Sequence, residues 1–262
     1  MTEFVTSPDG TRIAFTRIGS GPPVVLVAAA GQFRAFDGAT VELARQLADR
    51  GFTVVNYDRR GRGESTDTQP GGLDREIEDL STIVDAVGGT AALYGSSSGA
   101  VLALWAAQAG LDITKIALWE APLRLDDDGT ESLNGIRERV ERGDRDDAVA
   151  FFMRDMPPQW LASARASDSW PVMLSIAPTL AYDMEALARA QSGEDWAVQW
   201  NDVTMPVLVM FGEETLPIFP TAAKALVTAL PNARQLKIAA SNHGWRPEVM
   251  VAVLAEFFAP TA

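Results

Sequence analysis

The sequence predicts an α/β fold in which a mostly parallel eight-stranded sheet has helices on both faces and a helical cap inserted late in the chain. From residue 24 onward, apolar runs with the length of buried strands alternate with helical periodicities. Residues 90–109 read as a strand, a tight turn and a helix, and residues 124–202 contain no buried β-run. A length of 262 residues suffices for one large α/β domain with an insertion.

Composition narrows the possible partners and chemistry. A formal net charge of −13 would repel nucleic acid and anionic membrane surfaces, so we expect a small, hydrophobic substrate. The chain has no cysteine and a single histidine, which excludes a thiol nucleophile and argues against a zinc site of the usual kind. No cofactor is implied, and the oligomeric state is left open. The segment Met1–Phe4 has neither a basic nor a long apolar stretch, so we expect a soluble, cytoplasmic protein.

The first third of the chain predicts a hairpin followed by a buried strand. Residues 3–6 and 11–17 alternate like strands around the turn Pro8-Asp9-Gly10. Residues 24–27 form a continuous apolar run, mostly β-branched, that is typical of a strand buried on both faces. Small residues follow at 28–32, where backbone N–H groups can approach a substrate.

Helix and strand then alternate up to the tight turn. Helical spacing runs from Asp37, a possible N-cap, to residue 50, and 52–57 is another buried strand. We interpret the charges of the loop 58–65 as structural, because its first residue, an aspartate, can bind backbone N–H groups. An amphipathic helix over 73–87 leads into the next strand.

The turn between a strand at 90–93 and a helix at 100–109 has the frame Gly95-x-Ser97-x-Gly99. This frame fits a nucleophile elbow, because flanking glycines allow close packing of helix and strand around a strained central residue. Ser97 is therefore the candidate nucleophile. The helix that begins beside it would offer unpaired N–H groups and a positive dipole end to an oxyanion.

A strand at 116–119 ends at Glu120, and the pattern then changes. We expect residues 122–203 to form a helical cap, inserted between core segments 1–121 and 204–262. The expected cap helices are 131–142, 145–156, 159–166 and 184–191. Large apolar residues are distributed among them: Met153, Met156, Trp160, Trp170, Met173, Met184, Trp196 and Trp200. We expect most of them to form a small cap core and some, with Trp160 and Trp170 as candidates, to line an apolar pocket.

The α/β alternation resumes after the cap. The remaining predicted elements are a strand at 207–211, a helix at 220–230, a strand at 235–238 and a helix at 247–258. His243 lies between the last two elements, close after a strand, where ligands of α/β sheets bind. A serine nucleophile needs a base, and His243 is the chain's only imidazole.

Three stretches together resemble the α/β-hydrolase fold family: the elbow at 95–99, Tyr57–Ser65 and Asn242-His243-Gly244. The resemblance covers nearly the whole chain and implies the order nucleophile, acid, histidine. It also implies an oxyanion hole made by the backbone N–H groups of Ala30 and Ser98.

Two departures from the family pattern concern the oxyanion loop and the acid. The loop has Ala28-Ala29 where the family commonly has His-Gly, and Thr215 stands where the acid is usual. Glu120 occupies an alternative acid position, in a pattern similar to that of zearalenone lactonases and related actinobacterial hydrolases. We favour Glu120 as the acid, with Glu214 as the alternative.

The resemblance implies a serine hydrolase that cleaves a hydrophobic carboxylic ester or lactone through an acyl-enzyme, with a zearalenone-type macrolactone among the candidate substrates. Ser97 would be the nucleophile, His243 the base and Glu120 the group that fixes the imidazole. Two alternatives stay open. The protein can be a hydrolase of another bond, such as an amide or a carbon–carbon bond, or a non-hydrolytic ligand-binding protein of the same fold.

Overall fold

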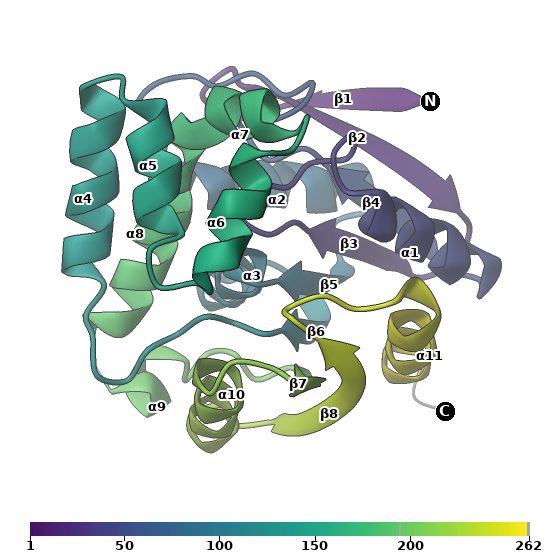
Figure 1. Ribbon diagram of the computed structural model, residues 1–262. Helices are drawn as coiled ribbons and strands as arrows, with labels where there is room; N and C mark the ends of the chain where they lie inside the picture. The colour runs from purple at the N-terminus through teal and green to yellow at the C-terminus, as the bar shows by residue number, and fades with distance from the viewer. Residues whose placement is uncertain (194, 261–262) are drawn as a thin grey trace.

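Eight strands form one sheet in the order β1-β2-β4-β3-β5-β6-β7-β8 in the computed structural model, which describes residues 1–193 and 195–260 (Figure 1). The pairs β1–β2 and β2–β4 are antiparallel and the other pairs are parallel, so the predicted fold class is confirmed. The strands are β1 (Thr2–Thr6), β2 (Arg12–Gly19), β3 (Pro23–Val27), β4 (Thr53–Tyr57), β5 (Ala91–Ser96), β6 (Ile113–Trp119), β7 (Val207–Glu214) and β8 (Ala233–Ser241).

Helices cover both faces of the sheet. They are α1 (Gly38–Asp49), α2 (Leu73–Ala86), α3 (Ser98–Gln108), α10 (Ile218–Ala229) and α11 (Pro247–Phe258). On one face, α1 and α11 share an apolar cluster with strand residues such as Val24 and Leu26, while α2, α3 and α10 share the cluster on the other face, which includes Val25 and Val27 (Figure 1). Successive strand residues point to opposite faces, so a strand covered on both faces is apolar throughout.

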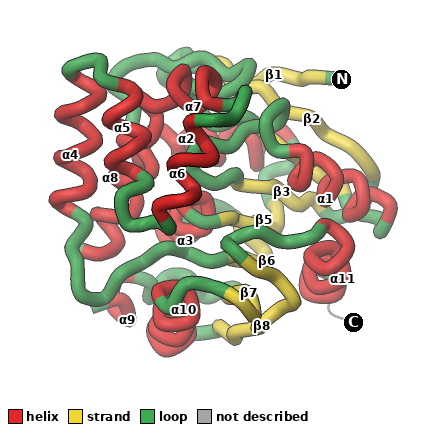
Figure 2. Tube along the Cα trace, in the orientation of Figure 1, coloured by secondary structure: helices red, strands yellow, loops and turns green. Residues whose placement is uncertain are grey.

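Of the helices between β6 and β7, all but the last lie together beside the sheet, and the last lies next to α10 (Figure 2). They are α4 (Thr130–Glu141), α5 (Arg145–Phe152), α6 (Pro158–Arg165), α7 (Trp170–Ile176), the 3₁₀ turn η1 (Ala177–Thr179) and α8 (Leu180–Gln191), followed by α9 (Trp196–Gln199). The sequence reading missed α7 and α9, which are too short to show a helical periodicity. Residue 194 of the expected cap and residues 261–262 of the expected core lie outside the described residues.

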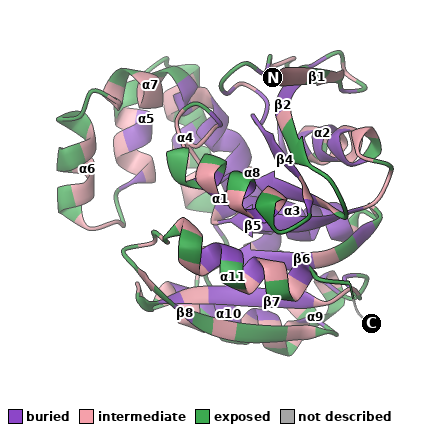
Figure 3. Cartoon of the chain, turned by 90° about the vertical axis from the view of Figure 1, so that its right-hand side faces the viewer, coloured by how far each residue is buried: buried purple, intermediate pink, exposed green. Residues whose placement is uncertain are grey.

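The cap helices have an apolar cluster of their own, but they are less buried than the sheet. Ile136, Val149 and Leu180 are at its centre, and Trp160 and Trp170 pack against it half-buried. Helix α6 has no buried residue, whereas the central strands are almost wholly buried (Figure 3).

Two of the tryptophans expected in the cap belong instead to the main core. Trp200 is fully buried, and its ring meets the ring of Trp105 on α3 edge-on at 4.7 Å. Trp196 packs against the same cluster. The expectation that Trp196 and Trp200 form the cap core or line its pocket is therefore wrong. The reason is that α9 lies next to α10, on the face of the sheet that α3 and α10 cover.

We expect Trp200→Ala to lower the free energy of unfolding by about 3–5 kcal/mol, because it empties a fully buried aromatic site that cannot collapse completely. Trp160→Ala is the matched control and should cost clearly less, because Trp160 is only half-buried. Urea unfolding of both variants measures the difference. Equal losses would contradict the placement of Trp200 in the main core.

Candidate active site

Ser97 lies at the sharp turn between β5 and α3. Its φ of 53° and ψ of −120° are strained for a residue with a side chain. The turn is held by two backbone hydrogen bonds: the Ser97 N–H donates to the Trp119 carbonyl at 2.8 Å, and the Ala100 N–H donates to the Ser97 carbonyl at 2.9 Å. This is the geometry of a nucleophile elbow.

The two glycines of the elbow allow contacts that no side chain would permit. A Cβ on Gly95 would lie 2.5 Å from the Gly99 carbonyl oxygen, and a Cβ on Gly99 would lie 2.3 Å from the Val27 carbonyl oxygen. Helix α3 can therefore pack directly on the ends of β5 and β3. This packing brings Ser97 close to the loop that follows β3.

Glu120 and His243 are in direct contact. His243 Nδ1 lies 2.5 Å from Glu120 Oε2, and Glu120 Oε1 accepts a hydrogen bond of 2.9 Å from the Gly212 N–H. The Glu120 side chain is fully buried and the His243 side chain is 27% exposed. A carboxylate that accepts the Nδ1 proton leaves Nε2 free to act as a base.

Backbone strain gathers at the same place. Within residues 1–193 and 195–260, the non-glycine residues with positive φ are Ser97, Glu120, Asn242 and His243. The His243 ring stacks on Phe219 with a centroid distance of 4.6 Å, and its carbonyl accepts a hydrogen bond of 3.2 Å from Trp119 Nε1. Strained residues persist where their surroundings hold them, which favours a functional role for this cluster.

Sheet register brings Ser97 next to this pair. Ser96 is paired with Trp119 across β5 and β6, so Ser97 and Glu120 follow neighbouring parallel strands. Among the described residues the Ser97 hydroxyl has no hydrogen-bond partner, and its bond to His243 is not formed. Such bonds commonly shorten only when substrate is bound.

The alternative acid, Glu214, lies at the exposed end of β7. Its backbone carbonyl accepts a hydrogen bond of 3.1 Å from the Asn242 N–H, but its carboxylate makes no contact with the His243 ring in the described structure. The structure therefore brings together His243 and Glu120 and leaves the Glu214 side chain outside.

Both expected oxyanion donors flank the elbow. Ser98 is the first residue of α3, so its backbone N–H has no partner within the helix. Ala30 lies in the loop after β3 and packs against the apolar cluster of the cap. The preceding carbonyls are held by arginines: Arg59 Nη1 donates to Ala28 O at 3.1 Å, and Arg62 Nη1 donates to Ala29 O at 2.9 Å.

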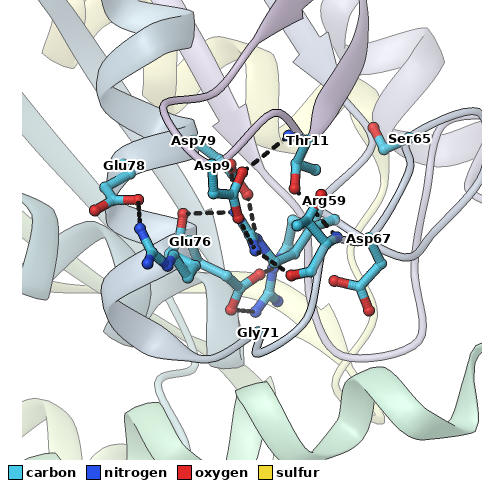
Figure 4. Close-up of polar contacts among 12 residues, drawn as sticks. Asp9, Thr11, Arg59, Ser65, Asp67, Gly71, Glu76, Glu78 and Asp79 are labelled. Carbon is cyan, nitrogen blue, oxygen red and sulfur yellow. Dashed lines mark hydrogen bonds and ion pairs between the residues drawn. The ribbon is translucent and has the colours of Figure 1, made fainter.

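Charged residues of the loop after β4 form a buried network of ion pairs. This agrees with the prediction that the charges of residues 58–65 have a structural role. Asp58 accepts hydrogen bonds from the backbone N–H groups of Arg34 at 2.8 Å and Glu64 at 2.9 Å. Arg59 pairs with Glu76 of α2 at 2.6 Å (Figure 4). The sequence pattern did not predict that arginines of this loop also donate hydrogen bonds to the carbonyls that precede Ala30.

Neither a metal-binding cluster nor a membrane-spanning helix is found among the described residues. Within the part of the chain that the structure describes, no group of three or more histidine, aspartate or glutamate side chains is arranged to hold a metal ion. The described helices also include none with the length and apolar character needed to cross a bilayer.

Comparison with known proteins decides the family. A model described as the alpha/beta hydrolase family matches residues 24–256. The chain belongs to this family. The chain resembles, at 40% identity and a TM-score of 0.88, the solved structure of an alpha/beta hydrolase from Sphaerobacter thermophilus, over 98% of this chain and 100% of the other.

Two further comparisons are more distant or partial. The esterase EaEST from Exiguobacterium antarcticum is 21% identical with a TM-score of 0.73, over 98% of this chain and 99% of the esterase, which shows a common fold. The polyketide synthase ThaQ of Burkholderia thailandensis is 30% identical over 92% of this chain. This chain spans only 12% of the length of that relative.

Proposed function

We propose that the protein is a serine hydrolase that cleaves a hydrophobic carboxylic ester or lactone through an acyl-enzyme. The observation that carries the proposal is the contact between Glu120 and His243 beside the strained Ser97. In the first step Ser97 Oγ attacks the carbonyl carbon while His243 Nε2 takes its proton, and His243 then returns the proton to the leaving alcohol. Water, activated by the same histidine, releases the acid.

Glu120 is the group we propose as the acid of this triad. Its buried carboxylate accepts from both His243 and Gly212, so it can fix the imidazole tautomer and stabilise the imidazolium. The exposed carboxylate of Glu214 makes no such contact among the described residues. The backbone N–H groups of Ala30 and Ser98 are proposed to bind the oxyanion.

An apolar substrate fits the surroundings of Ser97. The cap cluster with Trp160 and Trp170 packs against Ala30, the residue proposed as an oxyanion donor, and the chain's net charge of −13 disfavours anionic substrates. The resemblance of the acid position to zearalenone lactonases extends the proposal to bulky ring lactones. The expected cytoplasmic location and the absence of nucleic-acid and membrane partners stay predictions.

Truncation of a pocket tryptophan should change substrate preference. We expect Trp160→Ala and Trp170→Ala to raise KM for bulky esters or lactones more than for acetate esters, because each substrate methylene buried contributes about 0.8 kcal/mol. Steady-state kinetics over a series of p-nitrophenyl esters of increasing chain length measure the effect. A profile that stays flat with chain length in the unmodified protein would contradict an apolar pocket.

Reaction with a fluorophosphonate tests the enzyme against the ligand-binding alternative. A serine hydrolase should become phosphonylated at Ser97, as located by peptide mass spectrometry, and should then lose esterase activity. Ser97→Ala should not react. A folded wild-type protein that stays unlabelled would contradict the serine-hydrolase proposal and favour the ligand-binding alternative.

A further inference from the structure

Asp183 is a fully buried carboxylate on the cap helix α8, and its partners lie in the hydrolase core. It accepts hydrogen bonds from Ser98 Oγ at 2.7 Å, from Arg59 Nη1 at 2.6 Å and from Arg62 Nη2 at 2.5 Å. Ser98 is the residue directly after the candidate nucleophile. A single cap side chain thus contacts the start of α3 and the loop after β4.

The contacts continue from the arginines to the other side of the expected oxyanion hole. The guanidinium of Arg59 also donates to Ala28 O, and that of Arg62 donates to Ala29 O. These two carbonyls directly precede Ala30. Asp183 is therefore linked to both segments that carry the proposed oxyanion donors, through one bond to Ser98 and through two arginines to the Ala30 loop.

The charge state of Asp183 suits this arrangement. Burial by itself would raise the pKa of Asp183, but the charges of Arg59 and Arg62, together with the hydrogen bonds from Ser98 and Arg59, hold the pKa below its usual value. Asp183 is therefore a carboxylate at neutral pH. A buried ion cluster is costly to desolvate and gives little net stability, so its position suggests a task other than holding the fold together.

We propose that Asp183 is a positioning residue that aims the backbone N–H groups of Ser98 and Ala30 at the oxyanion of the reaction. The role extends the proposed function and depends on it, because an oxyanion forms only if Ser97 attacks a carbonyl. Its consequence is that docking of the cap and assembly of the oxyanion hole are one event, since Asp183 lies on α8 and both donors lie in the core.

Two variants test the proposal, with one matched control. Asp183→Asn removes the charge at constant shape, and Ser98→Ala removes only the hydroxyl while keeping the backbone N–H. The control is Asp74→Asn. Asp74 of α2 pairs with Arg189, which lies on the same helix as Asp183, but this ion pair is on the exposed surface. Each protein is measured for thermal unfolding, for kcat and KM on a p-nitrophenyl ester, and for the rate of fluorophosphonate labelling at Ser97.

Loss of one oxyanion donor lowers kcat by about 100- to 1000-fold. Displacement of a donor that is still present should lower kcat by a smaller factor. We expect kcat and the labelling rate to fall together, about 10- to 100-fold for Asp183→Asn and about 3- to 10-fold for Ser98→Ala. KM and the midpoint of the pH–rate profile should stay as in the unmodified protein, because neither variant touches the contact between His243 and Glu120. Asp74→Asn should behave like the unmodified protein.

The outcomes separate the two hypotheses. If folded Asp183→Asn and Ser98→Ala proteins keep the unmodified kcat and labelling rate, Asp183 has no positioning role, while the proposed function stands. If Asp183→Asn does not fold, Ser98→Ala decides alone, and an unchanged labelling rate overturns the proposal. If the unmodified protein does not react at Ser97, the proposed function fails, and the role of Asp183 fails with it.

Discussion

Replacement of Ser97 with alanine is expected to abolish turnover and to leave substrate binding nearly intact. The hydroxyl of Ser97 contributes to the transition state and not to the ground state, because it forms its bond to the substrate only during the reaction. Loss of a triad nucleophile costs about four to six orders of magnitude in rate. Esterase kinetics give the loss in kcat, and equilibrium binding of an unreactive substrate analogue shows that the pocket is unchanged.

Ser192→Ala is a suitable control for this experiment, because Ser192 is an exposed serine at the end of α8, far along the chain from the elbow. It should keep full activity and full labelling by the fluorophosphonate. A Ser97→Ala protein with unmodified activity would remove Ser97 from the mechanism and with it the elbow as the site of chemistry.

The second large effect is expected for Glu120→Gln, which should lower kcat by about 10⁴. The Gly212 N–H donates to Oε1, so the oxygen of the new amide would occupy that place and its NH₂ group would face His243 Nδ1. The amide then donates where the carboxylate accepted. The imidazole is forced into the tautomer that carries its proton on Nε2, and it can no longer accept the proton of Ser97.

Glu214→Gln provides the comparison, since it makes the same chemical change at an exposed side chain. Its effect on kcat should be small. Measurement of kcat for both variants at several pH values tests for loss of the base. The far-ultraviolet circular dichroism of both variants should be unchanged, which excludes loss of the fold as the cause. A large loss for Glu214→Gln with a mild loss for Glu120→Gln would reverse the assignment of the acid.

The fold, the candidate nucleophile turn and the candidate base could be predicted from local sequence patterns. Continuous apolar runs predicted strands that are buried on both faces, because each residue of such a strand must meet a helix layer on one side or the other. Gly95 and Gly99 predicted the elbow, since local sterics at a tight turn depend on residues next to each other in the chain. His243 followed as the candidate base because the chain contains no other imidazole.

Contacts between side chains that are far apart in the sequence could not be predicted and became visible in the folded chain. It placed Glu120 rather than Glu214 against His243, Trp200 in the main core, and Asp183 against Ser98. No local pattern encodes such contacts, because propensity and periodicity act over one helix or strand, whereas each contact depends on how separate elements pack. A carboxylate on a cap helix looks like any other until the cap is placed on the core, and there it becomes a buried charge with three donors.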